Sequence, residues 1–119
     1  MENQQHNFHS RYSRPHNVLE QVRFRLAEGI DSLDFLAANE PVQAWLRQQP
    51  GFLYRTLCQN PDSGEWIDLA YWADAETATA TNSQFMQQDA NREWVSMIDH
   101  GSMQMQHSEV LFAEAGTPA

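Results

Sequence analysis

The sequence predicts an α+β fold of the ferredoxin-like type, in which a four-stranded antiparallel sheet carries two helices on one face. Three observations favour it. Strand-like and helix-like stretches follow one another in the order strand, helix, strand, strand, helix, strand. A length of 119 residues suits one domain with a single core. Apolar residues make up 41% of the chain, enough to build that core.

The first predicted strand, residues 18–26, has the two-residue period of a strand, with apolar Val18, Val22, Phe24 and Leu26 on one face. After Gly29, Asp31 or Ser32 can cap a helix. We expect this helix to kink or restart at Pro41, because proline lacks a backbone donor and clashes with the preceding turn. Its expected buried positions are Leu33, Leu36, Ala37, Val42, Trp45 and Leu46.

The second half of the chain repeats this alternation of elements. Predicted strands at 52–59 and 66–72 flank the turn residues of 60–64, which indicates a hairpin. Asp74 is suited to cap a second helix, which should break or bend near Gln88 and Asp89. A last strand, 103–112, places Met103, Met105, His107, Glu109 and Leu111 on one face.

Composition excludes several functions. Seven arginines, no lysine and 16 acidic residues give a net charge of −9, which disfavours nucleic-acid binding. Without lysine the chain cannot form a Schiff base or a pyridoxal phosphate linkage. Cys58 is the only cysteine and is expected to be a small buried side chain. We expect a cytoplasmic protein with no membrane partner, because no secretory signal and no apolar run of roughly 20 residues is visible.

The chain is predicted to consist of a polar N-terminal tail (1–17), one folded domain (18–112) and a C-terminal tail (113–119). The N-terminal tail holds three histidines, but their spacing fits no ligand pair, so we predict no metal site. The notable residues of the domain are Glu20, Asp68 and His107, which stand in otherwise apolar alternations within predicted strands. Charged groups in core positions are candidates for chemistry, although such groups often serve only to satisfy one another.

Several motifs of the domain suggest a family. They are Gln-Pro-Gly-Phe at 49–52, Gly-Glu-Trp-Ile-Asp-Leu-Ala-Tyr-Trp at 64–72, Ala-Asp-Ala-Glu-Thr-Ala at 73–78, Phe-Met at 85–86 and Met-Ile-Asp at 97–99. With them the chain resembles, over roughly 18–112, the antibiotic-biosynthesis-monooxygenase-like proteins of the dimeric α/β barrel group. The resemblance implies a homodimer in which the open faces of two sheets meet, and a pocket between each sheet and its own helices.

The strand order of that group would place Glu20 between His107 and Asp68; the sequence does not fix the register that would bring them level. A buried carboxylate beside an imidazole can hold one mobile proton, which suits proton abstraction from an acidic carbon or phenol. The expected apolar walls of the pocket are Phe24, Trp66, Trp72, Phe85 and Trp94. Arg23, Arg25 and Arg55 are expected toward the barrel interior or solvent, where a purely structural role would be pairing at the dimer interface with acids such as Glu65.

Two functions follow from the resemblance. One is a cofactor-independent monooxygenase, or a related isomerase or cyclase, that acts on a small aromatic or polyketide-like substrate. The other is a non-catalytic homodimer that binds a small apolar or aromatic ligand. We expect no cofactor, because residues 73–99 lack the histidine that haem-degrading relatives carry on the second helix and the chain has no glycine-rich phosphate loop.

Overall fold

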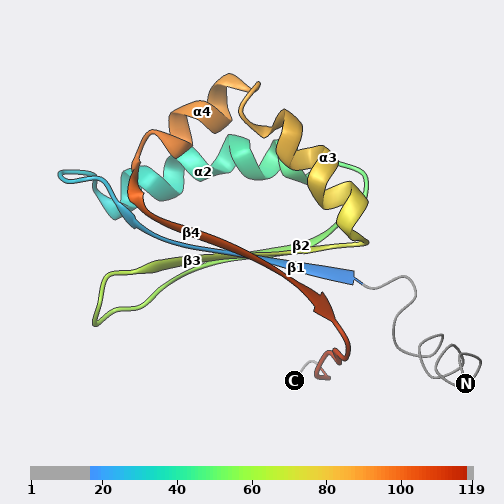
Figure 1. Ribbon diagram of the computed structural model, residues 1–119. Helices are drawn as coiled ribbons and strands as arrows, with labels where there is room; N and C mark the ends of the chain where they lie inside the picture. The colour runs from blue at the N-terminus through green and yellow to red at the C-terminus, as the bar shows by residue number, and fades with distance from the viewer. Residues whose placement is uncertain (1–16, 118–119) are drawn as a thin grey trace, which may run out of the picture.

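The computed structural model describes residues 17–117, in which three helices cover one face of a four-stranded sheet (Figure 1). The strands lie in the order β2-β3-β1-β4, and each neighbouring pair is antiparallel. The ferredoxin-like prediction is therefore confirmed. Apart from Asn17, the predicted polar tail and its histidines lie outside the described residues.

Most elements lie close to their predicted positions, but the last strand begins at Ile98, five residues before the predicted start, and ends at Val110. The elements are β1 (Asn17–Leu26), α2 (Ser32–Arg47), β2 (Phe52–Gln59), β3 (Trp66–Trp72), α3 (Ala75–Phe85), α4 (Asp89–Val95) and β4 (Ile98–Val110). The predicted hairpin joins β2 and β3, and the Asn60 side chain accepts hydrogen bonds from the backbone N–H groups of Asp62 and Ser63. No helix within residues 17–117 is long and apolar enough to cross a membrane.

The core lies between the sheet and the helices, and an aromatic cluster fills one end of it. Phe24 of β1 is 1% exposed, and its ring lies 5.7 Å from that of Phe35, 6.4 Å from Trp66 and 6.2 Å from Trp94, measured between centroids. Such rings combine a large buried area with favourable edge and stacked geometry. The cluster joins β1 and β3 to α2 and α4, and so fixes how far the helices stand from the sheet.

Helix α2 differs from the prediction in two respects. It continues without a break through Pro41, which is exposed, as is Ala37 four residues earlier. The backbone carbonyl of Ala37, which would accept from residue 41 if that residue were not proline, is therefore on the water-facing side of the helix, where water can bind it. The buried face is confirmed for the second half of the helix, where Val42 and Leu46 are buried, and was predicted wrongly for the first half, where Leu33 and Leu36 are 73% and 41% exposed. In that first half Phe35 is the buried residue.

The predicted break in the second helix is confirmed, since α3 ends at Phe85 and α4 begins at Asp89. The Asp74 side chain caps α3 by accepting the backbone N–H of Thr77 at 2.8 Å. Between the two helices, Asn91 Nδ2 donates to the Phe85 carbonyl at 2.9 Å. These bonds hold the turn between α3 and α4 over the sheet.

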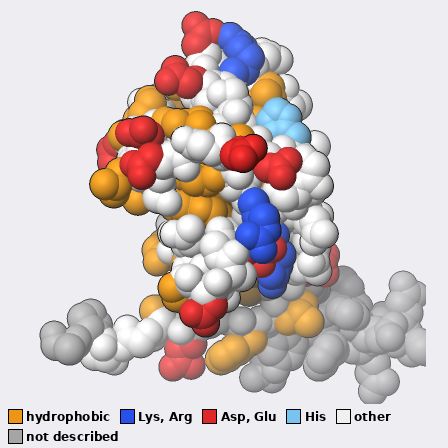
Figure 2. Space-filling model, turned by 90° about the vertical axis from the view of Figure 1, so that its left-hand side faces the viewer, with side chains coloured by type: hydrophobic (Ala, Val, Ile, Leu, Met, Phe, Trp, Pro, Cys, Tyr) orange, Lys and Arg blue, Asp and Glu red, His pale blue; other side chains and the backbone are white. Residues whose placement is uncertain are grey.

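The surface reflects the acidic composition. Figure 2 shows groups of acidic side chains scattered over one face of the molecule, with basic ones in fewer places. Cys58 is exposed on the edge strand β2, so the prediction of a buried thiol is wrong. Cys58 lies opposite Ile67 of β3, which in turn lies opposite Arg23 of β1. These residues alternate with those that face the helices, so they lie on the other face of the sheet. None of the described helices covers that face (Figure 1).

We predict that Gly51→Ala lowers the free energy of unfolding by about 2–3 kcal/mol, combining an unfavourable backbone with overpacking. Gly51 has a φ of +82°, and a Cβ there would lie 2.4 Å from Thr77 Oγ1 in the first turn of α3. Gly29→Ala is the matched control: its φ is +86°, but a Cβ would meet nothing within 4 Å. Urea denaturation of both variants should show the larger loss for Gly51→Ala; equal losses would contradict the steric argument.

Candidate functional site

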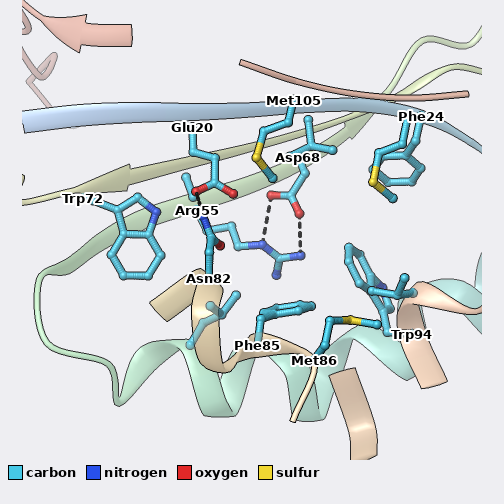
Figure 3. Close-up of a pocket in the computed structure, with 15 residues that line it drawn as sticks. Glu20, Phe24, Arg55, Asp68, Trp72, Asn82, Phe85, Met86, Trp94 and Met105 are labelled. Atoms are coloured by element: carbon cyan, nitrogen blue, oxygen red, sulfur yellow. Dashed lines mark hydrogen bonds and ion pairs between the residues drawn. The ribbon is translucent and has the colours of Figure 1, made fainter. Parts of the chain in front are cut away.

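A cavity of about 290 Å³ lies between the sheet and the helices (Figure 3). All four strands supply residues to one wall, and residues of α2, α3, α4 and the turn between α3 and α4 supply the opposite wall. Most of the lining is apolar, which suits a small ligand with few polar groups. The lining residues that carry the argument below are Glu20, Arg55, Asp68, Trp72, Asn82 and Trp94.

Glu20 is the polar group at one end of this cavity. It projects from the helix-facing side of β1, and its side chain is 12% exposed. Its Oε1 accepts a hydrogen bond of 3.1 Å from Asn82 Nδ2 of α3 and lies 3.2 Å from His107 Nε2. Among residues 17–117, Oε2 has no hydrogen-bond partner. One carboxylate oxygen is therefore held in place while the other is available to a ligand.

The register places Glu20 level with His107 of β4 on one side and with Ala70 of β3 on the other. His107 does not line the main cavity; its side chain is 44% exposed and lines a second cavity of about 190 Å³. That second cavity is formed with Val18, Ala75, Ala78, Thr79, Ser108 and Glu109. The Glu20–His107 contact thus lies between the two cavities.

Asp68 lines the main cavity but lies opposite Val22, two residues along from the Glu20 position. Its two carboxylate oxygens accept from Arg55 Nε and Nη2, each at 3.0 Å. The structure therefore brings Glu20 together with His107, and brings Asp68 together with Arg55. A carboxylate with both oxygens bonded to a guanidinium is poorly suited to act as a base.

The position of Arg55 corrects the expectation that it faces the barrel interior or solvent. Its side chain is 4% exposed and points into the layer between sheet and helices. Nη1 donates to Asn39 Oδ1 at 2.8 Å and to Gln43 Oε1 at 3.0 Å, both on α2. The guanidinium carbon lies 5.4 Å from the centroid of the Trp94 ring. Arg55 thus links β2 and β3 to two helices. Arg23 pairs with Glu65 of the same chain at 3.2 Å, whereas the expected pairing lay at the dimer interface.

Four of the five predicted aromatic residues line the main cavity: Phe24, Trp72, Phe85 and Trp94. Trp66 does not line it; it is 3% exposed and packs in the core against Phe24 and Phe35. The indole nitrogens of Trp72 and Trp94 are buried without a hydrogen-bond partner within the described chain. Buried donors of this kind normally find partners.

Sequence reasoning missed Asn82 and the methionines of the cavity. Asn82 stands in an Ala- and Thr-rich stretch of α3, where nothing in the pattern marks it, and only its 3.1 Å bond to Glu20 gives it a role. Met86, Met103 and Met105 also line the cavity, and Met86 and Met105 are 49% and 53% exposed. Because thioethers are flexible and polarizable, these side chains can adapt to ligands of different shape.

No protein-family model matches the sequence, and no curated protein matches it either. Solved structures do match. The ActVA-Orf6 monooxygenase of Streptomyces coelicolor, in complex with nanaomycin D, is 19% identical with a TM-score of 0.66, covering 86% of this chain and 94% of that one. SnoaB, a cofactor-independent oxygenase from Streptomyces nogalater, is 18% identical with a TM-score of 0.58, covering 87% and 99%.

A Nitrosomonas europaea protein classed among the antibiotic biosynthesis monooxygenases is 13% identical with a TM-score of 0.55, covering 83% of this chain and 90% of that one. A conserved Bacteroides thetaiotaomicron protein of unknown function shares the fold as well. Cofactor-independent oxygenases and proteins without an assigned reaction therefore both occur among the structural relatives, and at these identities the likeness is one of fold. The chain has the same ferredoxin-like fold as these oxygenases.

Proposed function

We propose that this protein is a cofactor-independent monooxygenase that acts on a small aromatic substrate with an acidic carbon, and that Glu20 is its base. The observation that carries the proposal is the free Oε2 of Glu20 at the end of an apolar cavity, with Oε1 fixed by Asn82. A carboxylate held at one oxygen and open at the other can take a proton from a bound carbon acid. The apolar walls favour a flat aromatic molecule.

The substrate itself can supply the electrons for this reaction. Removal of a proton from a CH₂ group flanked by aromatic rings leaves a delocalised carbanion, which can transfer electron density to dioxygen and form a C–O bond. The resulting peroxide anion takes up a proton to give a hydroperoxide. Loss of water then leaves a ketone, so that R₂CH₂ and O₂ become R₂C=O and H₂O. Glu20 would be required in the first step and would return a proton in a later one.

The other polar groups of the cavity would bind and orient rather than react. Asp68 is neutralised by Arg55, which makes that pair part of the wall. The unpartnered N–H of Trp72 can donate to a carbonyl or phenolate oxygen of the substrate. Figure 3 shows Trp72 and Glu20 at the same end of the cavity, so one substrate edge could meet both.

The alternative is a non-catalytic protein that binds a small apolar ligand. The ion pair between Arg55 and Asp68 favours this alternative, because it neutralises Asp68. Since His107 lies outside the cavity, Glu20 is then the one acid–base group without an ion-pair partner from the lining, among the residues that the structure describes. A single carboxylate with two indole donors would suffice to recognise a hydroxyl-bearing aromatic molecule without any reaction.

Anthrone is a suitable probe for deciding between these functions, since its CH₂ group lies between two aromatic rings and opposite a carbonyl. Oxygen uptake and formation of anthraquinone, measured with and without protein, should show catalysis if the monooxygenase proposal holds. Quenching of tryptophan fluorescence measures binding independently. Binding without oxygen uptake would favour the ligand-binding alternative, and absence of both would contradict the two proposals for this class of molecule.

We also propose that the protein is a homodimer formed through the uncovered face of the sheet. Leu19, Ile67, Leu69 and Tyr71 alternate with helix-facing residues on β1 and β3, and Tyr54 on β2 is 60% exposed. An apolar sheet face of this kind favours burial against a partner. We predict about twice the monomer mass in light scattering, and that Leu69→Glu reduces it toward the monomer. Monomer mass for the unaltered chain would contradict the proposal.

A further inference from the structure

We propose that His107 carries protons between Glu20 and the second cavity, so that Glu20 recovers its carboxylate form without bulk water entering the substrate cavity. The proposal rests on the proposed function, because it assigns a route for the proton that Glu20 removes. His107 does not itself line the main cavity and would act through Glu20, which does.

The first support is the position of the pair. Glu20 lines the main cavity and is 12% exposed at its side chain, whereas His107 lines only the second cavity and is 44% exposed. The two side chains meet at 3.2 Å, between Oε1 and Nε2. They therefore form a hydrogen-bonded connection from a largely apolar interior to a cavity that reaches the exposed side of β4.

The second support is the chemistry of the two ends. The proton from the substrate arrives at Glu20 Oε2, and rotation of the carboxyl group about its Cγ–Cδ bond brings it to Nε2. In the tautomer whose Nε2 carries no hydrogen, the imidazole accepts this proton and becomes an imidazolium that pairs with the carboxylate. It then releases the proton on Nδ1, which has no partner among the described residues, into the second cavity. When the substrate anion or the peroxide later takes up a proton, Nδ1 accepts one from that cavity and Nε2 passes its own to Glu20, which restores the starting tautomer.

The surroundings of His107 are compatible with this exchange. Glu20 faces it from β1, and Glu109 lines the same cavity from β4. From α3 the cavity is lined by Ala75, Ala78 and Thr79, none of which titrates. Both of these ionisable neighbours are acidic.

The test uses anthrone under argon in D₂O, where exchange of its CH₂ hydrogens for deuterium reports proton transfer without oxygen chemistry. Proton NMR of the whole chain with anthrone gives the exchange rate. The variant is His107→Gln, since glutamine can still donate a hydrogen bond to Glu20 but cannot carry a proton. His100→Gln is the matched control: His100 also lies on β4, but it contacts the Val95 carbonyl and not Glu20. Circular dichroism checks that each variant folds.

In dilute buffer the unaltered protein should accelerate exchange, and His107→Gln should slow it by about tenfold or more, within the range of general acid–base contributions. Added imidazole should restore the rate of His107→Gln but not that of Glu20→Gln, and His100→Gln should match the unaltered protein. A normal rate for His107→Gln, or a slow rate that imidazole does not restore, would overturn the proton route alone. No acceleration by the unaltered protein would overturn both this route and the role of Glu20.

Discussion

Replacing Arg55 with methionine should lower the free energy of unfolding by about 3–5 kcal/mol, the range seen when one partner of a buried ion pair is removed. The Arg55 and Asp68 side chains are 4% and 14% exposed, and the carboxylate would lose both of its bonds of 3.0 Å. Asn39 and Gln43 on α2 would lose the donor that they share. Urea denaturation at one fixed protein concentration measures the loss, since stability of an oligomer depends on concentration.

Two further variants separate the ion pair from general disruption. Arg55→Met combined with Asp68→Leu removes both charges, and should recover much of the loss because no buried charge is left unpaired. Arg23→Met breaks the pair with Glu65, whose side chains are 44% and 33% exposed, and should cost less than about 1 kcal/mol. If Arg55→Met costs no more than Arg23→Met, the Arg55 pair does not hold the helices on the sheet.

The order of elements could be predicted from sequence because it depends on local signals. The turn residues of 60–64, the Asp74 cap and the two-residue period of β1 each act within a few positions of the chain. The buried face of α2 could not be predicted in the same way. Leu33 and Leu36 are as apolar as the residues that are buried, and the packing of Phe35 against the rings of Phe24 and Trp66 decides which face turns inward.

The candidate site was predictable to the extent that it depends on which strands are neighbours. The order β2-β3-β1-β4 brings β4 beside β1, and the register sets His107 level with Glu20. The partner of Asp68 was not predictable, because it depends on the register between β1 and β3 and on a side chain from β2. Asp68 lies two residues away from Ala70, the residue of β3 that is level with Glu20. At that position Asp68 binds Arg55 and not Glu20. No local pattern encodes that offset, since both positions lie on the helix-facing side.

Glu20→Gln should reduce the rate of anthrone oxidation by about 10²–10⁴-fold, the usual contribution of a general base. Glutamine has nearly the same shape and can still accept from Asn82 at its amide oxygen, so the melting temperature should change by only a few degrees. Oxygen uptake at saturating anthrone, with fluorescence quenching to confirm that the variant still binds, measures the effect.

Comparison with Asn82→Ala shows whether Glu20 acts through its chemistry or its position. That variant keeps the carboxylate but removes the 3.1 Å bond that orients it, so it should lose less activity than Glu20→Gln. Unchanged oxidation by Glu20→Gln would show that the carboxylate is not the base. Unfolding of Glu20→Gln would show instead that Glu20 has a structural role, in which its contacts with Asn82 and His107 join α3 and β4 to β1. Glutamine changes the charge at this junction but hardly its shape, so the loss would be due to the charge.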